Sequence, residues 1–271
     1  MLTNAGQPAL TVEVGSDLDP GIKRGQKPNE DTLSITHGVI PALASKPFLL
    51  LMVADGMGGQ ANGQEASRLA TQILTRSVSD ALRVRRVTPE SFQTLLKAGI
   101  EDANWVLHER NQGQDSNMGT TMTAALLVDA TAYVAHVGDS RLYRYREGVG
   151  LSQITQDHSL VAALAAAGII RPEDIYTHPR RNLIYRCLGE KSQVEVDTVT
   201  LPLTAGDMLL LCSDGLWEMV RDPQIAALLA APTGDPSRTA HTLIRAALAG
   251  GGEDNVSAIV VRVSSTWYQV E

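Results

Sequence analysis

Two long apolar runs along the chain end in the same way. Phe48–Ala54 leads into Asp55-Gly56, and Met208–Ser213, with a predicted strand at Met208–Cys212, leads into Asp214-Gly215. Short apolar runs that are bounded by turn-forming residues predict buried strands. A carboxylate at the end of a buried strand is costly unless a cation neutralises it. The hydrophobic pattern therefore predicts an acidic centre at the ends of these strands.

Other short segments rich in aliphatic and β-branched residues predict more strands, at Thr121–Val128, Thr131–Val137, Arg141–Tyr145 and Ala258–Val263. The short connection between Val128 and Thr131 is typical of a hairpin, so the strands that it joins should be antiparallel. Strands occur next to strands in this pattern, without the strict alternation of strand and helix that marks a parallel sheet.

Apolar residues recur at helical spacing in two neighbouring segments, Glu65–Val84 and Pro89–Glu109. Thr88-Pro89 combines a capping hydroxyl with a proline at the first helical position, and Asp222-Pro223 and Asp235-Pro236 predict two later helix starts. We expect an α+β fold, a β-sandwich of two antiparallel sheets flanked by pairs of α-helices. The polar segment from Thr155 to Gly189, with a short Ala-rich helix at Leu160–Ala167, is interpreted as a mobile insertion over a site.

Composition and charge exclude several classes of protein. The 271 residues carry a formal net charge of −7, which argues against nucleic acid as the main partner. No apolar stretch is long enough to predict a membrane-spanning helix, and the first residues lack the order of a signal peptide. Cys187 and Cys212 have no metal-binding spacing, and we interpret both as reduced thiols. We expect a soluble, cytoplasmic protein.

Each acidic candidate also has a plain structural interpretation. Asp55 and Asp214 precede glycines and, taken singly, each is also typical of a hairpin turn. Glu30-Asp31 also fits a solvated loop, Asp139 a turn, and Asp254 an Asx turn. Together, acids at the ends of several separate strands favour one shared site over independent turns.

The chemistry of these candidates predicts the metal. The ligands are oxygens, and no cluster of Cys or His accompanies them, so the site favours Mg²⁺ or Mn²⁺ over Zn²⁺ or Cu²⁺. The glycine-rich segment Gly56–Gly59 lets the backbone approach a ligand closely and offer it a carbonyl. A carboxylate that bridges two ions creates a site that activates water, which suits hydrolysis of phosphate esters.

Short motifs then occur in the order of a known family, at Asn29–Asp31, Val53–Gly59, Met118–Thr121, Val137–Arg141, Thr155–Ser159, His178–Asn182, Cys212–Leu216 and Glu253–Ser257. By these motifs the chain resembles the metal-dependent protein phosphatases of the PPM or PP2C type from Gly21 to Val263, and Met57 resembles the bacterial branch. The resemblance implies one phosphatase domain over residues 1–271, with a flap at about 155–190 and metals at one end of the sandwich.

The resemblance also implies roles for the acidic residues. Asp55 would bridge two Mn²⁺ or Mg²⁺ ions, and the Gly56 carbonyl would bind one of them. Asp214 and Asp254 would complete the first metal site. Glu30 and Asp31 would hold the second metal and its waters. A weaker third metal would bind Asp139, with help from Asp214 and Asn182.

The implied reaction is hydrolysis of phosphoserine and phosphothreonine in proteins by metal-activated water, without a phosphoenzyme. Asp55, Asp214 and Asp254 are the implied catalytic carboxylates. The implied partners are substrates of Hanks-type kinases, and the implied oligomeric state is a monomer. A catalytically inactive scaffold of the same fold is the alternative, and a phosphatase dedicated to one substrate is a further one.

Two departures from the family pattern affect substrate binding and proton transfer. Gln26 stands where many relatives carry a phosphate-binding arginine, so Arg24 is the first candidate for the catalytic phosphate clamp and Lys27 the second. A solvated surface charge is the alternative for both. Met57 and Gln60 stand where relatives place a histidine, so the leaving group takes its proton from a metal-bound water or another residue. We interpret His158 and His178 as structural or substrate-facing, and His136 as a core histidine.

Overall fold

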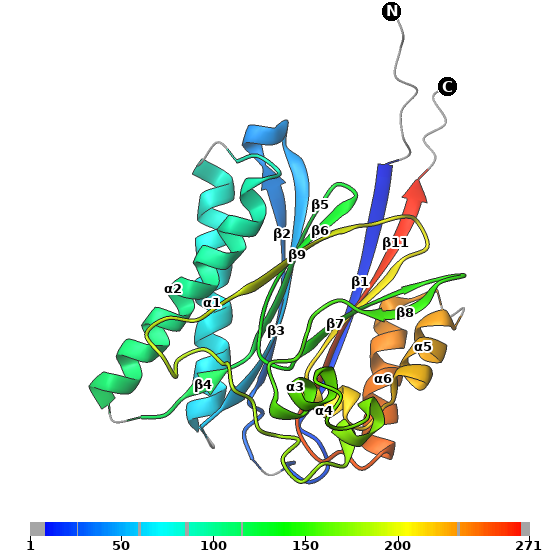
Figure 1. Cartoon of the computed structure of the whole chain (residues 1–271). Helices are drawn as coiled ribbons and strands as arrows, with labels where there is room; N and C mark the ends of the chain where they lie inside the picture. The colour runs from blue at the N-terminus through cyan, green and yellow to red at the C-terminus, as the bar shows by residue number, and fades with distance from the viewer. Residues whose placement is uncertain are drawn as a thin grey trace, which may run out of the picture.

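The computed structural model describes residues 9–25, 27–58, 61–84, 87–114, 116–231 and 234–266. Two antiparallel sheets pack face to face, with helices on both outer faces (Figure 1). The first sheet has the order β1 (Ala9–Asp19), β11 (Val256–Thr266), β10 (Met208–Cys212), β7 (Arg141–Arg146) and β8 (Gly150–Gln153). The second has the order β2 (Asp31–Ile40), β3 (Lys46–Met57), β5 (Met122–Val128), β6 (Thr131–Val137) and β9 (Asp197–Pro202), and β4 (Gly119–Thr120) pairs with the end of β3. The predicted fold class is confirmed.

Pairs of helices cover the outer faces of the sandwich. Helices α1 (Ala61–Val84) and α2 (Ser91–Gln114) lie over the second sheet, and α5 (Asp222–Ala230) and α6 (Pro236–Ala249) lie over the first. The shorter elements are α3 (Leu160–Ala166), α4 (Asp214–Trp217) and the 3₁₀ turns η1 (Pro41–Leu43) and η2 (Pro172–Tyr176).

The long apolar runs are explained by burial on both faces of a strand. Along β3, Leu50, Met52 and Ala54 belong to the core beneath α1 and α2. Leu49, Leu51 and Val53 alternate with them and belong to the core between the sheets. Where a strand is covered on both sides its residues are continuously apolar, as they are over Phe48–Ala54 of β3 and along β10.

One predicted helix start was wrong, and α5 begins at Asp222 as predicted but without the predicted aspartate cap. Helix α2 begins at Ser91, because Thr88, Pro89 and Glu90 form a turn that the Ser91 N–H closes on the Thr88 carbonyl at 2.9 Å. Arg221 occupies the cap position of α5, and the Asp222 carboxylate accepts a hydrogen bond from the Tyr143 hydroxyl at 3.1 Å. The predicted cap of α6 is confirmed, since the Asp235 side chain accepts from the Ser237 N–H.

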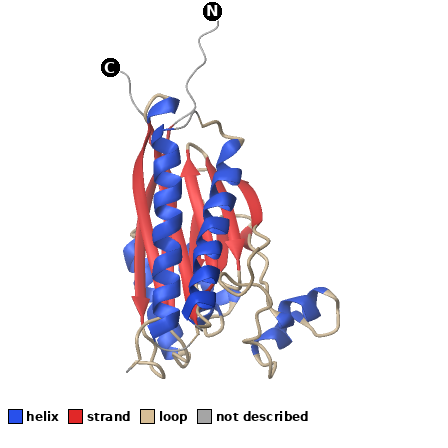
Figure 2. Cartoon of the chain, turned by 90° about the vertical axis from the view of Figure 1, so that its left-hand side faces the viewer, coloured by secondary structure: helices blue, strands red, loops and turns tan. Residues whose placement is uncertain are grey.

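The segment from Thr155 to Gly189 carries α3 and η2 and projects from one end of the sandwich (Figure 2). Its two arms are joined where the Leu160 N–H donates to the Leu183 carbonyl and the Tyr185 N–H donates to the His158 carbonyl. Arg181 pairs with Glu218 at 3.2 Å and with Glu253 at 3.1 Å. The mobility of this segment and its role as a flap stay predictions.

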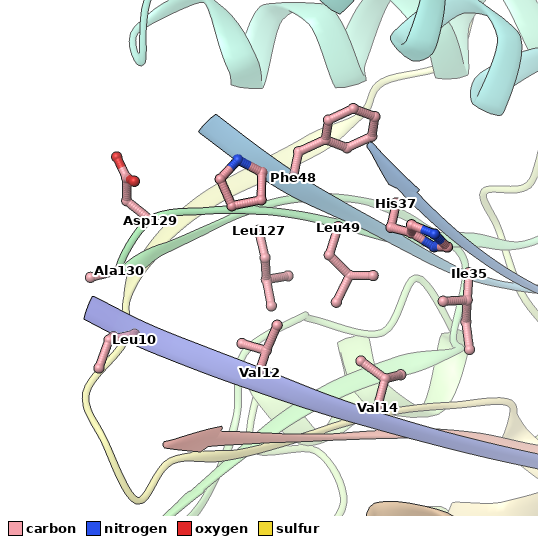
Figure 3. A pocket seen from close by; sticks show the side chains of 11 residues that line it. Leu10, Val12, Val14, Ile35, His37, Phe48, Leu49, Leu127, Asp129 and Ala130 are labelled. Carbon is pink, nitrogen blue, oxygen red and sulfur yellow. The ribbon is translucent and has the colours of Figure 1, made fainter. Parts of the chain in front are cut away.

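The two sheets separate near the start of β3, around an apolar cleft of about 750 Å³ (Figure 3). Val12 and Val14 point into it from β1, and Leu49 and Leu127 point toward them from the second sheet. The cleft and the acidic residue Asp55 lie toward opposite ends of β3.

Among the described parts of the chain, no helix combines the length and the apolar character needed to cross a membrane.

Candidate metal centre

The predicted acidic residues meet at one end of the sandwich. Asp55 of β3 lies opposite Asp31 of β2 in the strand register. Burial raises the pKa of Asp55 well above its usual value, and the negative charges of Asp31, Asp214, Asp139 and Asp254 raise it further. Because such effects need short distances, these aspartates share one site although they lie far apart along the chain.

Neither Asp-Gly pair forms the hairpin turn that each allows in isolation. Strand β3 continues through Asp55, and Gly56 pairs with Thr120 of β4. The Asp55 N–H donates to the Thr121 hydroxyl at 2.9 Å, which fixes the backbone at that position. Asp214 instead opens the short helix α4, after Ser213 at its cap position. The two similar sequences therefore deliver their carboxylates from different backbone conformations.

Gly56 is required by a close approach of the first turn of α1. A Cβ atom on Gly56 would lie 2.0 Å from the Gly63 carbonyl oxygen. A Cβ atom on Gly63 would lie 2.4 Å from Oε1 of Glu30. The two glycines therefore bring α1, β3 and Glu30 into contact at the acidic centre.

Glu30 and Asp31 are both buried but are held by different elements. The Glu30 N–H donates to Oδ1 of Asn255 at 2.8 Å, and its carbonyl accepts from the Ser67 hydroxyl at 2.6 Å. The Asp31 carboxylate accepts from the Ser213 hydroxyl at 2.6 Å. Glu30 is thus set against α1, and Asp31 against the opposite sheet.

The chemistry of the donor set fits a divalent metal. Within the described residues, Oε1 of Glu30, Oδ1 of Asp31 and Oδ1 of Asp214 are buried without a hydrogen-bond partner. Buried anionic oxygens are costly when nothing compensates their charge. Oxygen-only ligands suit Mg²⁺ and Mn²⁺. Among the described ranges, no three Asp, Glu, His or Cys side chains stand in a coordinating arrangement.

The raised pKa values of the buried aspartates also favour a bound cation. Burial raises the pKa of Asp31 to about 6, against the effect of the hydrogen bond from Ser213. Burial, followed by the charge of Asp157, raises the pKa of Asp139 to about 7. The pKa of Asp214 also lies well above its usual value, because of burial and the charge of Asp139. Crowded carboxylates in a dry site favour either protons or a cation.

The basic candidates lie in different environments. Arg24 is half-buried and its guanidinium pairs with Glu30 and with Asp254, two of the predicted metal ligands. The Lys27 side chain is exposed. The backbone N–H of Lys27 donates to the Arg24 carbonyl at 2.7 Å. The assignment of the phosphate clamp to either residue stays a prediction. Gln26, Gly59 and Gln60 lie outside the described residues.

The sequence did not reveal the residues that orient the acids. Asn255 accepts from the Glu30 N–H and donates to the Pro20 carbonyl at 2.8 Å, so it joins the loop before β2 to the start of β11. Ser213 holds Asp31, and Thr121 holds the backbone of Asp55. Asn255 and Ser213 stand next to acids in the sequence, which was their only signal, because their contacts cross from one sheet to the other. Thr121 has no acidic neighbour, and its contact with Asp55 lies within one sheet.

The histidines have structural contacts. His136 is a core histidine, as predicted: it lies 2.9 Å from the Thr123 hydroxyl, and burial lowers its pKa to about 3. His158 accepts from the Gly138 N–H at 2.9 Å and thereby joins the projecting segment to the loop that carries Asp139. His178 accepts from the Arg180 N–H at 3.1 Å. Both cysteines are free.

Comparison with known proteins identifies the family. Residues 22–249 match the family described as Protein phosphatase 2C. The serine/threonine phosphatase stp of Listeria monocytogenes is 38% identical over 235 residues, which are 86% of this chain and 89% of that protein. The crystal structure of the Mycobacterium tuberculosis serine/threonine phosphatase PstP/Ppp is similar with a TM-score of 0.79 and 34% identity, over 93% of this chain and 99% of that one.

A second PstP structure concerns its catalytic domain in complex with two manganese ions. It is 33% identical with a TM-score of 0.78, over 94% of this chain and 100% of that one. Stp1 from Staphylococcus aureus has a TM-score of 0.83 at 31% identity, over 97% of this chain and 99% of its own. The chain described here belongs to the protein phosphatase 2C family.

Proposed function

We propose that this protein hydrolyses phosphoserine and phosphothreonine in other proteins, with two Mn²⁺ or Mg²⁺ ions as cofactors. The observation that carries this function is the buried acidic centre with its unpartnered oxygens on Glu30, Asp31 and Asp214. Similar proteins named serine/threonine phosphatases, and the manganese complex of PstP, support the reaction and the metal.

The metal ligands are assigned by their order in the sequence and by their convergence. Asp55, Asp214, Asp254 and the Gly56 carbonyl would hold one ion, and Asp55 would also contact the other. Glu30 and Asp31 would serve that other ion, while Asp139 and Asp214 would serve a weaker third. When bound, the ions would supply an activated water and neutralise charge on the phosphoryl group.

The surrounding protein keeps these ligands in place. Ser213 orients Asp31, Asn255 orients the backbone of Glu30, and Thr121 orients that of Asp55. Hydrogen bonds of this kind raise metal affinity because they lower the freedom of each ligand. Arg24, or in its place Lys27, binds the substrate phosphate.

We further propose that the chain acts as one monomeric phosphatase domain in the cytoplasm, where it opposes Hanks-type kinases. The names of its bacterial relatives support phosphoproteins as the substrates, and its net charge of −7 argues against nucleic acid as a partner. The inactive alternative has no support, because every predicted carboxylate ligand is present.

The test is release of phosphate from phosphothreonine and phosphoserine peptides by the purified protein. We expect turnover with Mn²⁺ or Mg²⁺, none with a chelator, and none from Asp55→Asn. Asp80→Asn is the matched control, because Asp80 is an exposed residue of α1 that pairs with Arg76. Absence of metal-dependent turnover in the wild type, or equal activity in Asp55→Asn, would refute the proposed function.

A further inference from the structure

The Arg24 guanidinium lies at the acidic centre. It forms ion pairs with Glu30 and with Asp254. These carboxylates come from opposite ends of the chain and are assigned above to two different metal ions. Arg24 and the metals therefore compete for the same oxygens.

The pairing is close but incomplete. The Arg24 side chain is 23% exposed, whereas that of Glu30 is 3% exposed, so water reaches part of the Arg24 side chain. Nε of Arg24 is buried without a partner among the described residues, and so is Oε1 of Glu30. One guanidinium thus leaves part of the negative charge of the centre uncompensated. A divalent ion carries twice the charge and can approach several oxygens at once, so it should displace the side chain.

The backbone around Arg24 is anchored, so only the side chain has to move. The Lys23 N–H donates to the Gly252 carbonyl at 3.0 Å, and the Lys23 ammonium pairs with Glu253 at 2.5 Å. A Cβ atom on Gly21 would lie 2.0 Å from the Asp254 carbonyl oxygen, so this loop packs directly against the segment that carries Asp254. Rotation about the side-chain bonds of Arg24 is sufficient to release both carboxylates.

We propose that Arg24 is an internal counter-cation, which neutralises Glu30 and Asp254 in the metal-free protein and leaves them when the metal ions bind. Released from the carboxylates, its guanidinium faces the same centre and is available to the phosphoryl group of the substrate. This inference rests on the proposed function for the identity of the competing cation. A contact that is made only without metal stabilises the metal-free protein and weakens metal binding by the same free energy.

The experiment compares Mn²⁺ binding, by calorimetric titration, with the melting temperature in chelator. Arg24→Gln should lower the melting temperature in chelator and tighten Mn²⁺ binding by roughly tenfold, which corresponds to about 1.4 kcal/mol. Arg24→Lys keeps the positive charge but lacks the two-armed geometry of a guanidinium. Its Mn²⁺ affinity and its melting temperature should lie between those of the wild type and of Arg24→Gln. Lys27→Gln removes the same charge from the same loop without touching Glu30 or Asp254, and should change neither quantity.

The outcomes separate this inference from the proposed function. If Arg24→Gln binds Mn²⁺ no more tightly than the wild type, the exchange is refuted and the proposed function stands. Equal destabilisation with and without Mn²⁺ would also refute it, because it would show a purely structural role. A wild-type protein that binds neither Mn²⁺ nor Mg²⁺ would refute the proposed function together with the exchange. With metal bound, Arg24→Gln should raise the Michaelis constant more than Lys27→Gln does, and the reverse order would move the phosphate contact to Lys27.

Discussion

Two clusters of buried charge lie close together in this protein, and they are built on opposite principles. In the first, Arg141 donates to both carboxylate oxygens of Asp157, at 2.9 and 2.7 Å, and to the Tyr143 hydroxyl at 2.6 Å. Its guanidinium also lies 3.6 Å from the centre of the Trp217 ring. In the second, the metal centre, Glu30 and Asp254 share the guanidinium of Arg24, and Glu30, Asp31 and Asp214 keep unpartnered oxygens.

The difference indicates which charges the fold needs and which it reserves for a ligand. Where a buried charge serves only the structure, as with Asp157, the chain provides a matching partner. Trp217 joins the two clusters, because its indole N–H donates to the Asp139 carbonyl at 3.0 Å. The cluster of Arg141 and Asp157, whose charges are paired, therefore packs directly beside the metal centre, whose charges are not fully paired.

The same substitution should have opposite effects in the two clusters. Asp214→Asn should lower phosphate release by more than about 100-fold, the upper range for residues that merely orient a metal ligand. It should also raise the melting temperature in chelator, because it removes a charge that burial and Asp139 disfavour. Asp157→Asn should lower that melting temperature. If the melting temperature in chelator changed in the same direction in both variants, the distinction between the two clusters would be refuted.

Loss of the arginine in the satisfied cluster should be the largest effect on stability. Arg141→Met leaves the Asp157 carboxylate buried without its partner, which should cost about 3–5 kcal/mol of unfolding free energy. Urea denaturation in the presence of Mn²⁺ measures it. Arg262→Met, which removes an exposed pair with Glu13, is the control and should change little. A small loss in Arg141→Met would mean that Asp157 is not held mainly by this pair.

Removal of one orienting hydroxyl should have a moderate effect on metal binding. Ser213→Ala takes away the hydrogen bond to Asp31 and should weaken Mn²⁺ binding by about 10-fold. Thr71→Val also removes a buried hydroxyl, but that hydroxyl bonds only to the backbone of its own helix. Calorimetric titration of both variants measures the difference, and similar affinities in the two would show that Ser213 does not orient a ligand.

The smallest expected effect is the pH dependence of the metal-free protein. The raised pKa values of Asp31, about 6, and Asp139, about 7, mean that the folded state retains protons that the unfolded state has released. Stability from these groups is complete below the usual carboxyl pKa of about 4 and is lost as the pH rises through the folded values. The melting temperature in chelator should therefore fall between pH 4.5 and about 7.5. A melting temperature that rises over this interval would contradict the assignment, whereas with Mn²⁺ it should rise, because metal binding needs ionised ligands.

The sequence predicted the parts of the fold that are buried on both faces. Strands β6 and β10 have the expected bounds, and β3 extends the expected run at both ends. The sheet-edge strands β1 and β2 were missed, because one side of each faces water and their residues mix polar and apolar types. Their place in the sheets depends on pairing with strands far along the chain, which periodicity does not show.

The acidic centre was predictable as a set of residues but not as an arrangement. Asp55-Gly56 and Asp214-Gly215 look alike in sequence, yet pairing with β4 keeps the first extended and the burial of Leu216 and Trp217 turns the second into a helix. The contact of Arg24 with Glu30 and Asp254 also depends on the packing of its loop against Gly252. Contacts of this kind are decided by tertiary structure.

The close approach of Gly56 in β3 to Gly63 in α1 limits which residues these two positions can accept. Each glycine is blocked by atoms beside the other, since a Cβ on Gly56 meets the Gly63 carbonyl and a Cβ on Gly63 meets the Glu30 carboxylate. No single substitution at either position is compensated by a change at its neighbour, because glycine has no smaller replacement. In a library of random variants, these two codons should be among the least tolerant in the chain.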